Sequence, residues 1–321
     1  MCKIFTLIGI DPAASDAAYR LVHAAAPLLS ASERDGYGYV ATDGVTLGGE
    51  RWLRPVEAWR VRESDPPTRW SGMLDAGVGY RSFGHVVTHP KVIASHARTS
   101  TNRVSIRNVH PFYDAVRNVG LIHNGVVEIR DGDTDYAGAD GCDSASILAA
   151  YSAGGCADDF AMLQTVLGGI YGWHACVVVT PDHVDVWRHG ASLHAYDAGP
   201  LGLLLTTSEA IPVEAAKVAK VEIRGSWRIT EDVVTRLTPG GAVIARESFR
   251  SPGSSMPKRK RKKDKREISQ HESWYAESEL VQAALEDELS LTKAVIKIKE
   301  GKKANGSSTA VTAAYMRGEI G

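Results

Sequence analysis

The chain has 321 residues, of which 44% are hydrophobic and 23% are charged, as is typical of a globular protein with one large or two smaller domains. Its formal net charge of −1 argues against a polyelectrolyte, and no run approaches the ~18 apolar residues that a membrane helix needs. Nothing near the N-terminus resembles a signal peptide, and the four cysteines form no CxxC pair, which argues against a disulfide framework or a zinc knuckle. We therefore expect a cytoplasmic protein that uses no metal or other cofactor.

Hydrophobic patterning in the first half of the chain predicts mainly strands. The predicted elements are a strand at Lys3–Ile10, a helix at Ala13–Leu29, a turn and strand from Asp35 to Val40, an irregular segment at Arg51–Gly79, and strands at Lys91–Ala97 and Val119–Val127. The helix is entered through Asp11-Pro12, a helix-start signal.

The second half is predicted to contain two short helices and then closely spaced strands. The helices are expected at Asp143–Tyr151 and Asp158–Leu167, and the strands at Ala175–Thr180, Val184–Arg188 and Leu201–Thr207. The strands follow one another too closely for helical crossovers, which favours antiparallel sheets with helices packed outside them.

Composition changes near residue 250, where a main domain at residues 2–248 is expected to end. We expect a flexible basic linker at residues 249–272, an amphipathic helix at 273–300 and a disordered tail at 301–321. The helix either docks on a partner or completes the fold. The run Lys258–Arg266 contains the sequence KRKRKKDKR and could contact nucleic acid, although a basic run without interleaved aromatic residues is more typical of a solvated linker.

Cys2 stands directly behind the initiator methionine. Cysteine is small enough to permit removal of Met1, which would leave the thiol beside a free α-amine with a pKa of about 7.7–8.0. A thiol and a proton acceptor in one residue form a self-contained nucleophile. The alternative is a cysteine that lies near the terminus by chance.

Three further groups suit an amino-acid amide, and each has a structural alternative. A predicted strand ends in Arg98 and hydroxyl residues that include Thr101, which would bind a carboxylate or else lie in solvent. Asn124 and Gly125 could form an oxyanion hole, although Asn-Gly more often marks a hairpin turn. Asp143 could hold a substrate ammonium or cap a helix.

Together, these motifs closely resemble the class II glutamine amidotransferase domain, a family of N-terminal-nucleophile hydrolases. The motifs are, in order, Met-Cys at the start, DGYG at 35–38, HARTST at 96–101, NVHPF at 108–112, HNGVV at 123–127 and Asp-Ser at 143–144, with further matches at 168–172, 187–193 and 206–209. The resemblance covers about residues 2–245.

The resemblance implies a four-layer αββα sandwich of two antiparallel sheets, and it implies a role for each matching residue. Cys2 would be the nucleophile, with its own α-amine as the base. Arg98 and Thr101 would bind the α-carboxylate of glutamine, and Asp143 would bind its α-ammonium. Asn124 and Gly125 would form the oxyanion hole. His96 and His110 match positions that support the site rather than react.

Three functions remain open. The first is a glutamine amidotransferase subunit that passes ammonia to a separate synthase, since no segment after residue 250 resembles a synthase domain. The second is a free-standing γ-glutamyl amidase, which the turn at 35–38 favours. The third is a catalytically idle binding module. Ala145 stands where the family often has a glutamate, which leaves the expected ammonium pocket one acid short.

Overall fold

The computed structural model describes residues 2–30, 35–53, 80–99, 106–129 and 142–250, all of which lie in the compact unit Met1–Pro257. The expected basic run, C-terminal helix and tail fall outside these residues, as does most of the irregular segment expected at Arg51–Gly79. In this described part of the chain, no helix is both long enough and apolar enough to cross a membrane.

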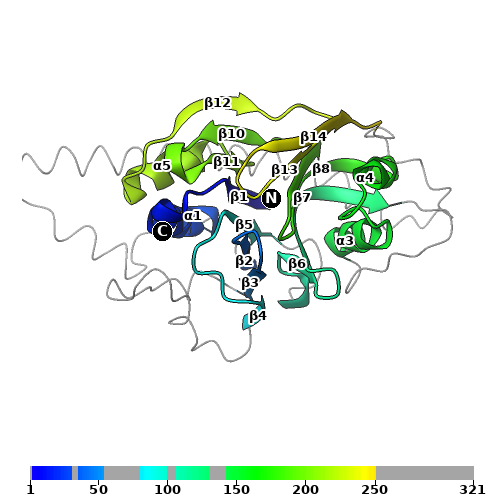
Figure 1. The fold of residues 1–321 in the computed structure, drawn as a ribbon, viewed down its shortest axis with the longest axis horizontal. Helices are drawn as coiled ribbons and strands as arrows, with labels where there is room; N and C mark the ends of the chain where they lie inside the picture. Colours follow the sequence, from blue (N-terminus) through cyan, green and yellow to red (C-terminus); the bar gives the residue numbers. More distant parts are fainter. Residues whose placement is uncertain (1, 31–34, 54–79, 100–105, 130–141, 251–321) are drawn as a thin grey trace, which may run out of the picture. The chain divides into compact units, whose positions relative to one another are not determined.

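Two sheets form the centre of the fold (Figure 1). In sheet A, the described strands lie in the order β12 (Arg224–Arg228), β10 (His194–Asp197), β11 (Leu203–Thr206), β1 (Lys3–Ile8), β5 (Val92–Arg98), β2 (Gly36–Thr42), β3 (Leu47–Trp52) and β4 (Tyr80–Gly84). In sheet B, the order is β14 (Val243–Ser248), β13 (Val233–Leu237), β9 (Val184–His189), β8 (Ile170–Val179), β7 (Val119–Ile129) and β6 (Phe112–Asp114). The pairings of these strands are antiparallel, as the sequence predicted.

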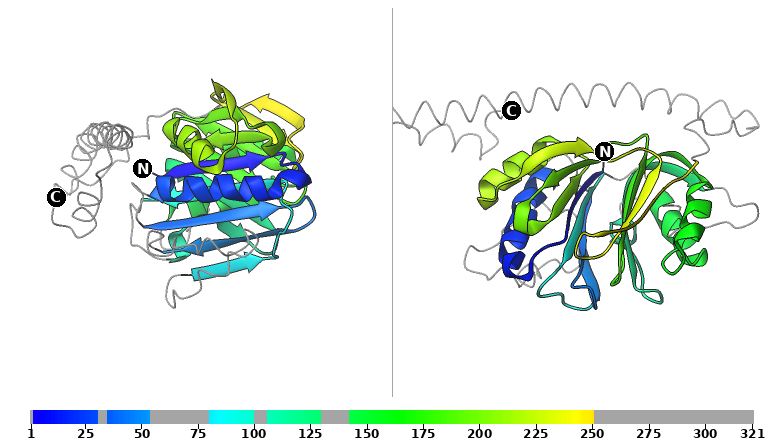
Figure 2. Two further views of the ribbon diagram at one scale, coloured as in Figure 1. Left: turned by 90° about the vertical axis from the view of Figure 1, so that its left-hand side faces the viewer. Right: turned by 45° about the horizontal axis from the view of Figure 1, so that its top comes forward.

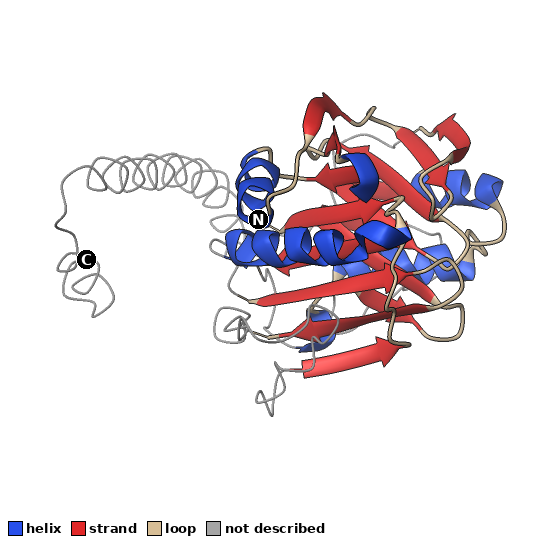
Figure 3. Ribbon diagram, turned by 60° about the vertical axis from the view of Figure 1, so that its left-hand side comes forward, coloured by secondary structure: helices blue, strands red, loops and turns tan. Residues whose placement is uncertain are grey.

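Helices cover the outer faces of the two sheets (Figures 2 and 3). The helices are α1 (Ser15–Ser30) and α5 (Ala210–Ala219) over sheet A, and α3 (Asp143–Ala153) and α4 (Phe160–Leu167) over sheet B. Three apolar cores separate the four layers: one under α1 and α5, one between the sheets, and one under α3 and α4. The predicted αββα sandwich is confirmed.

Local sequence signals explain several element ends. The side chain of Asp11 accepts a hydrogen bond from the Ala13 N–H at 2.8 Å, and Pro12 begins the short 3₁₀ helix η1 (Pro12–Ala14) that leads into α1. Asp159 caps α4 in the same way. Two expectations were wrong: Arg51 belongs to β3 rather than to an irregular segment, and the N-cap of α3 is Cys142 rather than Asp143.

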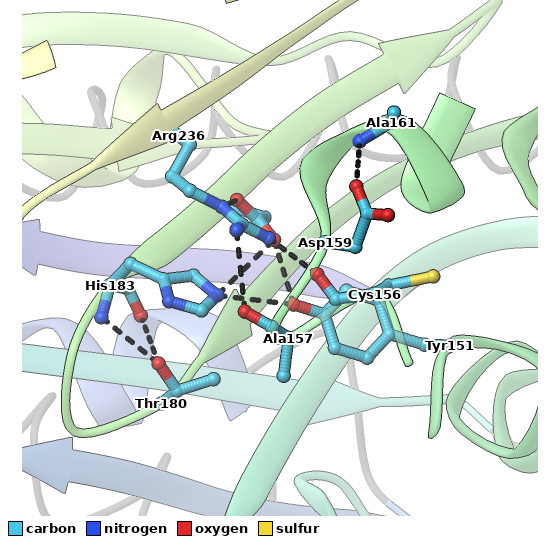
Figure 4. A network of polar contacts seen from close by, with 9 residues as sticks. Tyr151, Cys156, Ala157, Asp159, Ala161, Thr180, His183 and Arg236 are labelled. Carbon is cyan, nitrogen blue, oxygen red and sulfur yellow. Dashed lines mark hydrogen bonds and ion pairs between the residues drawn. The ribbon is translucent and has the colours of Figure 1, made fainter. Parts of the chain in front are cut away.

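A buried ion cluster fastens the end of α3 to sheet B (Figure 4). The Asp185 carboxylate on β9 accepts two 2.8 Å hydrogen bonds from Arg236 on β13 and one of 2.7 Å from the Tyr151 hydroxyl on α3. Arg236 also donates to the carbonyl oxygens of Cys156 and Ala157. Burial alone would raise the pKa of Asp185, but hydrogen bonds and charges from Arg236 and from His183 outweigh it and lower that pKa. We call Tyr151, His183, Asp185 and Arg236 the Asp185 cluster.

Candidate active site

Cys2 lies just before β1, on the face of sheet A that looks toward sheet B. The next residue, Lys3, pairs with Ala97 of β5, and the Cys2 Sγ lies 3.7 Å from the carbonyl oxygen of Thr99. Ile4 belongs to the core between the sheets, and side chains two residues apart on a strand share a face. The half-buried thiol therefore points into the space between the sheets, at the end of β5.

The same alternation places two predicted residues of β5 beside it. Ala94 lies in the inter-sheet core, so His96 and Arg98 face sheet B as well. Arg98 is only 4% exposed, and its guanidinium donates to the carbonyl oxygen of Asn108. Thr101, the other predicted carboxylate ligand, lies outside the described residues.

Two glycines of the DGYG motif allow a second segment to cross this part of sheet A. Gly36 pairs with Arg98 and Gly38 pairs with His96. A Cβ atom on Gly38 would collide with the His110 carbonyl oxygen, and one on Gly36 would collide with the Val109 side chain. Glycine at these positions lets residues 109–111 lie on β2, and the His110 ring packs 3.9 Å from the His96 ring, measured between centroids.

Asn124 and Gly125 lie inside β7 rather than in a turn, which contradicts the hairpin interpretation. Asn124 pairs with Ala175 of β8 and Gly125 pairs with His174, and the ladder continues to Ile129. The neighbours of Asn124 identify its face: Ile122 and Ala175 both belong to the inter-sheet core. The Asn124 side chain therefore faces the same space as Cys2, and its Oδ1 is buried without a hydrogen-bond partner among the described residues.

The backbone of β7 shows where the N–H of Gly125 points. Within β7, β6 pairs only with Val119–Leu121. After Leu121, the edge of β7 on that side is therefore not paired with β6. On this edge, the His123 carbonyl oxygen bonds with His96 Nε2 at 2.8 Å, and the Val127 N–H donates to Asp143 Oδ2 at 3.1 Å. Because backbone groups of alternate residues point to the same edge, the N–H of Gly125 is directed between these two contacts.

Gly125 cannot be replaced without strain. Its φ of +150° lies in a region that glycine favours, and a Cβ atom there would collide with the Trp173 carbonyl oxygen. Close packing between β7 and β8 thus requires glycine at position 125. An amide side chain and an adjacent backbone N–H at this place are the groups that an oxyanion hole needs.

Asp143 is the first residue of α3, and its carboxylate already has protein partners. In addition to Val127, it accepts a 2.8 Å hydrogen bond from the Ser144 N–H. The pKa of the preceding thiol, that of Cys142, is raised mainly by burial. Two charges also act on it: Asp143 raises this pKa and Arg98 lowers it. The groups predicted to bind the ammonium and the carboxylate of one amino acid therefore act on the same neighbouring thiol.

The histidines around these groups are held neutral. Burial is the main cause, and it lowers the pKa of His96 and His110 well below the usual value; Arg98 and the neighbouring histidines act in the same direction. The His123 pKa is also lowered by burial, although Asp143 partly opposes the shift. His96 and His110 are therefore uncharged groups whose rings pack against each other, and their support of the site stays a prediction.

Two residues to which the sequence assigned no role, His123 and Thr207, make hydrogen bonds beside the predicted site residues. The His123 ring bonds with the Ser144 hydroxyl at 2.8 Å, and the Thr207 hydroxyl accepts the Ile4 N–H at 3.0 Å, which secures the start of β1. The HNGVV motif includes His123 next to Asn124, but no sequence signal indicates that the His123 ring bonds with Ser144 on α3. Among the described residues, no group of three or more His, Cys, Asp or Glu side chains is arranged to hold a metal ion.

No family model and no curated protein matches the sequence. Solved structures do match. One is a glutamine phosphoribosylpyrophosphate amidotransferase from B. subtilis, complexed with ADP and GMP, at 16% identity and a TM-score of 0.52. Another, described as the allosteric regulatory enzyme of purine biosynthesis, has 16% identity and a TM-score of 0.55. Each match covers 78% of this chain and 49% of the other. A glutamine aminotransferase class-II domain protein from Silicibacter pomeroyi matches over its whole length, at 14% identity and a TM-score of 0.42.

At this level of identity, the likeness shows the fold. The chain has the fold of glutamine amidotransferases, and the resemblance that the sequence motifs indicated is confirmed at that level. The chain spans about half the length of the first two matched chains.

Proposed function

We propose that this protein is a glutamine amidotransferase subunit, which hydrolyses the side-chain amide of glutamine through an N-terminal cysteine. The observation that supports the proposal is the strand register, which directs Cys2, Arg98 and Asn124 toward the space between the sheets. The N–H of Gly125 and the carboxylate of Asp143 lie on the adjoining edge of β7. A nucleophile, a carboxylate-binding cation, an oxyanion hole and an acid for an ammonium are the complement of groups that glutamine requires.

In the first half of the reaction, Met1 has been removed and the α-amine of Cys2 takes the proton of its own thiol. The thiolate attacks the carboxamide carbon, and the oxygen of the resulting tetrahedral intermediate accepts hydrogen bonds from Asn124 and Gly125. The C–N bond then breaks, the α-ammonium returns its proton to the departing nitrogen, and ammonia leaves a γ-glutamyl thioester on Cys2.

In the second half, the α-amine takes a proton from water as the water attacks the thioester carbon. A second oxyanion forms in the same hole, the C–S bond breaks, and the thiol regains its proton as glutamate leaves. Arg98 and Asp143 hold the two charged ends of the substrate throughout. We propose that a synthase on a separate chain receives the ammonia.

Covalent labelling tests the nucleophile directly. A diazoketone analogue of glutamine should add one label to Cys2, because Cys142, Cys156 and Cys176 are buried and burial raises the pKa of each of these three thiols. Intact-mass analysis of the labelled protein also reports whether Met1 has been removed. Excess glutamine should protect Cys2 from the label.

The matched variant is Cys2→Ala. It should lower glutamate release by more than about 10³-fold, since the covalent step is lost, while glutamine still binds in calorimetry. Met1 retained in active protein, a label on another cysteine, or undiminished turnover by Cys2→Ala would each refute the proposed mechanism. Wild-type hydrolysis of a γ-glutamyl conjugate in preference to glutamine would instead identify a free-standing amidase.

A further inference from the structure

Two polar contacts join the N-terminus of α3 to the middle of β7. Asp143 Oδ2 accepts from the Val127 N–H at 3.1 Å, and Ser144 Oγ bonds with His123 Nδ1 at 2.8 Å. These contacts bracket Gly125, which lies two residues from each of their β7 partners. We call Asp143, Ser144, His123 and Val127 the α3–β7 latch.

The His123 ring lies behind the proposed oxyanion hole. Leu121 belongs to the core under α3, so the His123 side chain also points to the α3 face of sheet B, opposite to Asn124. Its Nε2 is 2.9 Å from the place that a Cβ atom on Gly125 would occupy. The ring therefore supports the backbone of Gly125 from the side away from the proposed substrate.

The backbone and the side chain of His123 make hydrogen bonds to two different layers of the protein. Its carbonyl oxygen bonds with His96 Nε2 of sheet A at 2.8 Å, whereas its ring bonds with Ser144 of α3. Both side chains of the ring contact are buried, His123 being 1% exposed. Water competes little for a hydrogen bond at such a depth. Loss of the Ser144 hydroxyl leaves His123 Nδ1 unsatisfied, whereas Ser144 also has a 3.4 Å contact with Asp143 Oδ1.

We propose that His123 and Ser144 are a positioning pair, which sets the Gly125 N–H for the transition-state oxyanion. This inference rests on the proposed function and adds two residues to its machinery without giving them contact with substrate. When the Ser144 hydroxyl is removed, Asp143 keeps its 3.1 Å and 2.8 Å bonds from the Val127 and Ser144 N–H groups and loses only a 3.4 Å contact from that hydroxyl. The pair should consequently affect kcat much more than KM.

Four variants test the pair. Ser144→Ala and His123→Leu remove the contact, and each should lower kcat for glutamine by about 10- to 100-fold with KM changed by less than about threefold. His123→Asn places an amide oxygen or nitrogen near the position of Nδ1, and it should retain kcat within about threefold. Tyr151→Phe removes a buried hydrogen bond further along α3, in the Asp185 cluster, and should reduce thermal stability while kcat is unchanged.

The outcomes separate positioning from mere stability. The inference is overturned if Tyr151→Phe lowers kcat as far as Ser144→Ala does. It is also overturned if His123→Asn and His123→Leu have the same kcat. Equal kcat in wild type and Ser144→Ala would do the same. If wild-type protein freed of Met1 releases no glutamate, the proposed function is overturned as well. If the wild type is active and Ser144→Ala and His123→Leu have the same kcat as the wild type, only the positioning role is overturned.

Discussion

Arg98 and Arg236 are both buried, at 4% and 7% exposure, yet the protein surrounds them differently. Arg236 makes two hydrogen bonds to the Asp185 carboxylate and donates to two backbone carbonyl oxygens. Arg98 donates to the Asn108 carbonyl oxygen, and its neighbours His96 and His110 are held neutral. One arginine has its counterion inside the protein, and the other lies beside the half-buried Cys2.

This difference separates the Asp185 cluster, in which charges are paired within the protein, from the proposed site. In the Asp185 cluster, both carboxylate oxygens are bonded. Near Arg98, Asn124 Oδ1 and both ring nitrogens of His110 are buried without a hydrogen-bond partner among the described residues. An unsatisfied buried polar group costs about 1–3 kcal/mol, so such groups near Arg98 fit the proposed binding of an amino acid there.

The largest effect is expected for Arg236→Leu. It leaves the Asp185 carboxylate buried without its cation, and the free energy of unfolding should fall by about 3–5 kcal/mol in urea denaturation. The turnover of the molecules that remain folded should change little, because the hydrogen bonds and ion pairs of the Asp185 cluster with other described residues involve none of the proposed site residues. Replacing both partners in Arg236→Leu/Asp185→Leu should restore part of the lost stability. A single variant as stable as wild type would show that the cluster is not structural.

Arg98→Leu should have the opposite profile. The substrate carboxylate loses its charged partner, so glutamine affinity should fall by about 2–5 kcal/mol, whereas unfolding changes less than in Arg236→Leu. Isothermal titration of glutamine into Cys2→Ala, with and without the Arg98 change, measures this without turnover. Arg98→Lys keeps the charge but not the paired donors and should recover part of the affinity. Equal glutamine affinity in the two proteins would remove Arg98 from the site.

Much of the fold could be predicted because its signals are local. Alternating or continuous apolar runs identified β1, β5 and the β8–β9 hairpin, and the order of motifs indicated the sandwich. The helix α5 and the strands β12, β13 and β14 were not predicted. β12 and β14 are edge strands with mostly exposed side chains, so they lack the buried stripe on which pattern reading depends.

The site shows the same limit. Cys2, Arg98, Asn124 and Asp143 could be named from motif chemistry, but the face on which each lies depends on strand register, which is a long-range property. The Asn-Gly pair illustrates this: local propensity predicts a turn, whereas the pairing with Ala175 and His174 keeps the strand extended. The bond between His123 and Ser144 joins residues 21 positions apart, and no local pattern encodes it.

The smallest expected effect is a pH dependence of stability that arises from the buried histidines. Burial is the main cause that lowers the pKa of His174 to about 3, and the neighbouring His123 and His189 act in the same direction. In the unfolded chain, the same group titrates near 6.5, so as the pH falls below that value the unfolded state binds a proton that the folded state does not. Stability is full above pH 6.5 and should fall by about 1.4 kcal/mol per pH unit for each such histidine, with the His174 contribution ending near pH 3.

Urea denaturation between pH 7.5 and 5 measures that slope, and His174→Gln should make it shallower by about 1.4 kcal/mol per pH unit. His89→Gln is the matched control, because the His89 side chain is exposed. His174 pairs with Gly125, so its ring is buried beside the same strand that carries the proposed oxyanion hole. A slope that is equal in wild type and His174→Gln would mean that His174 takes up its proton in the folded protein, and the strand next to Gly125 would then be more open to water than its burial indicates.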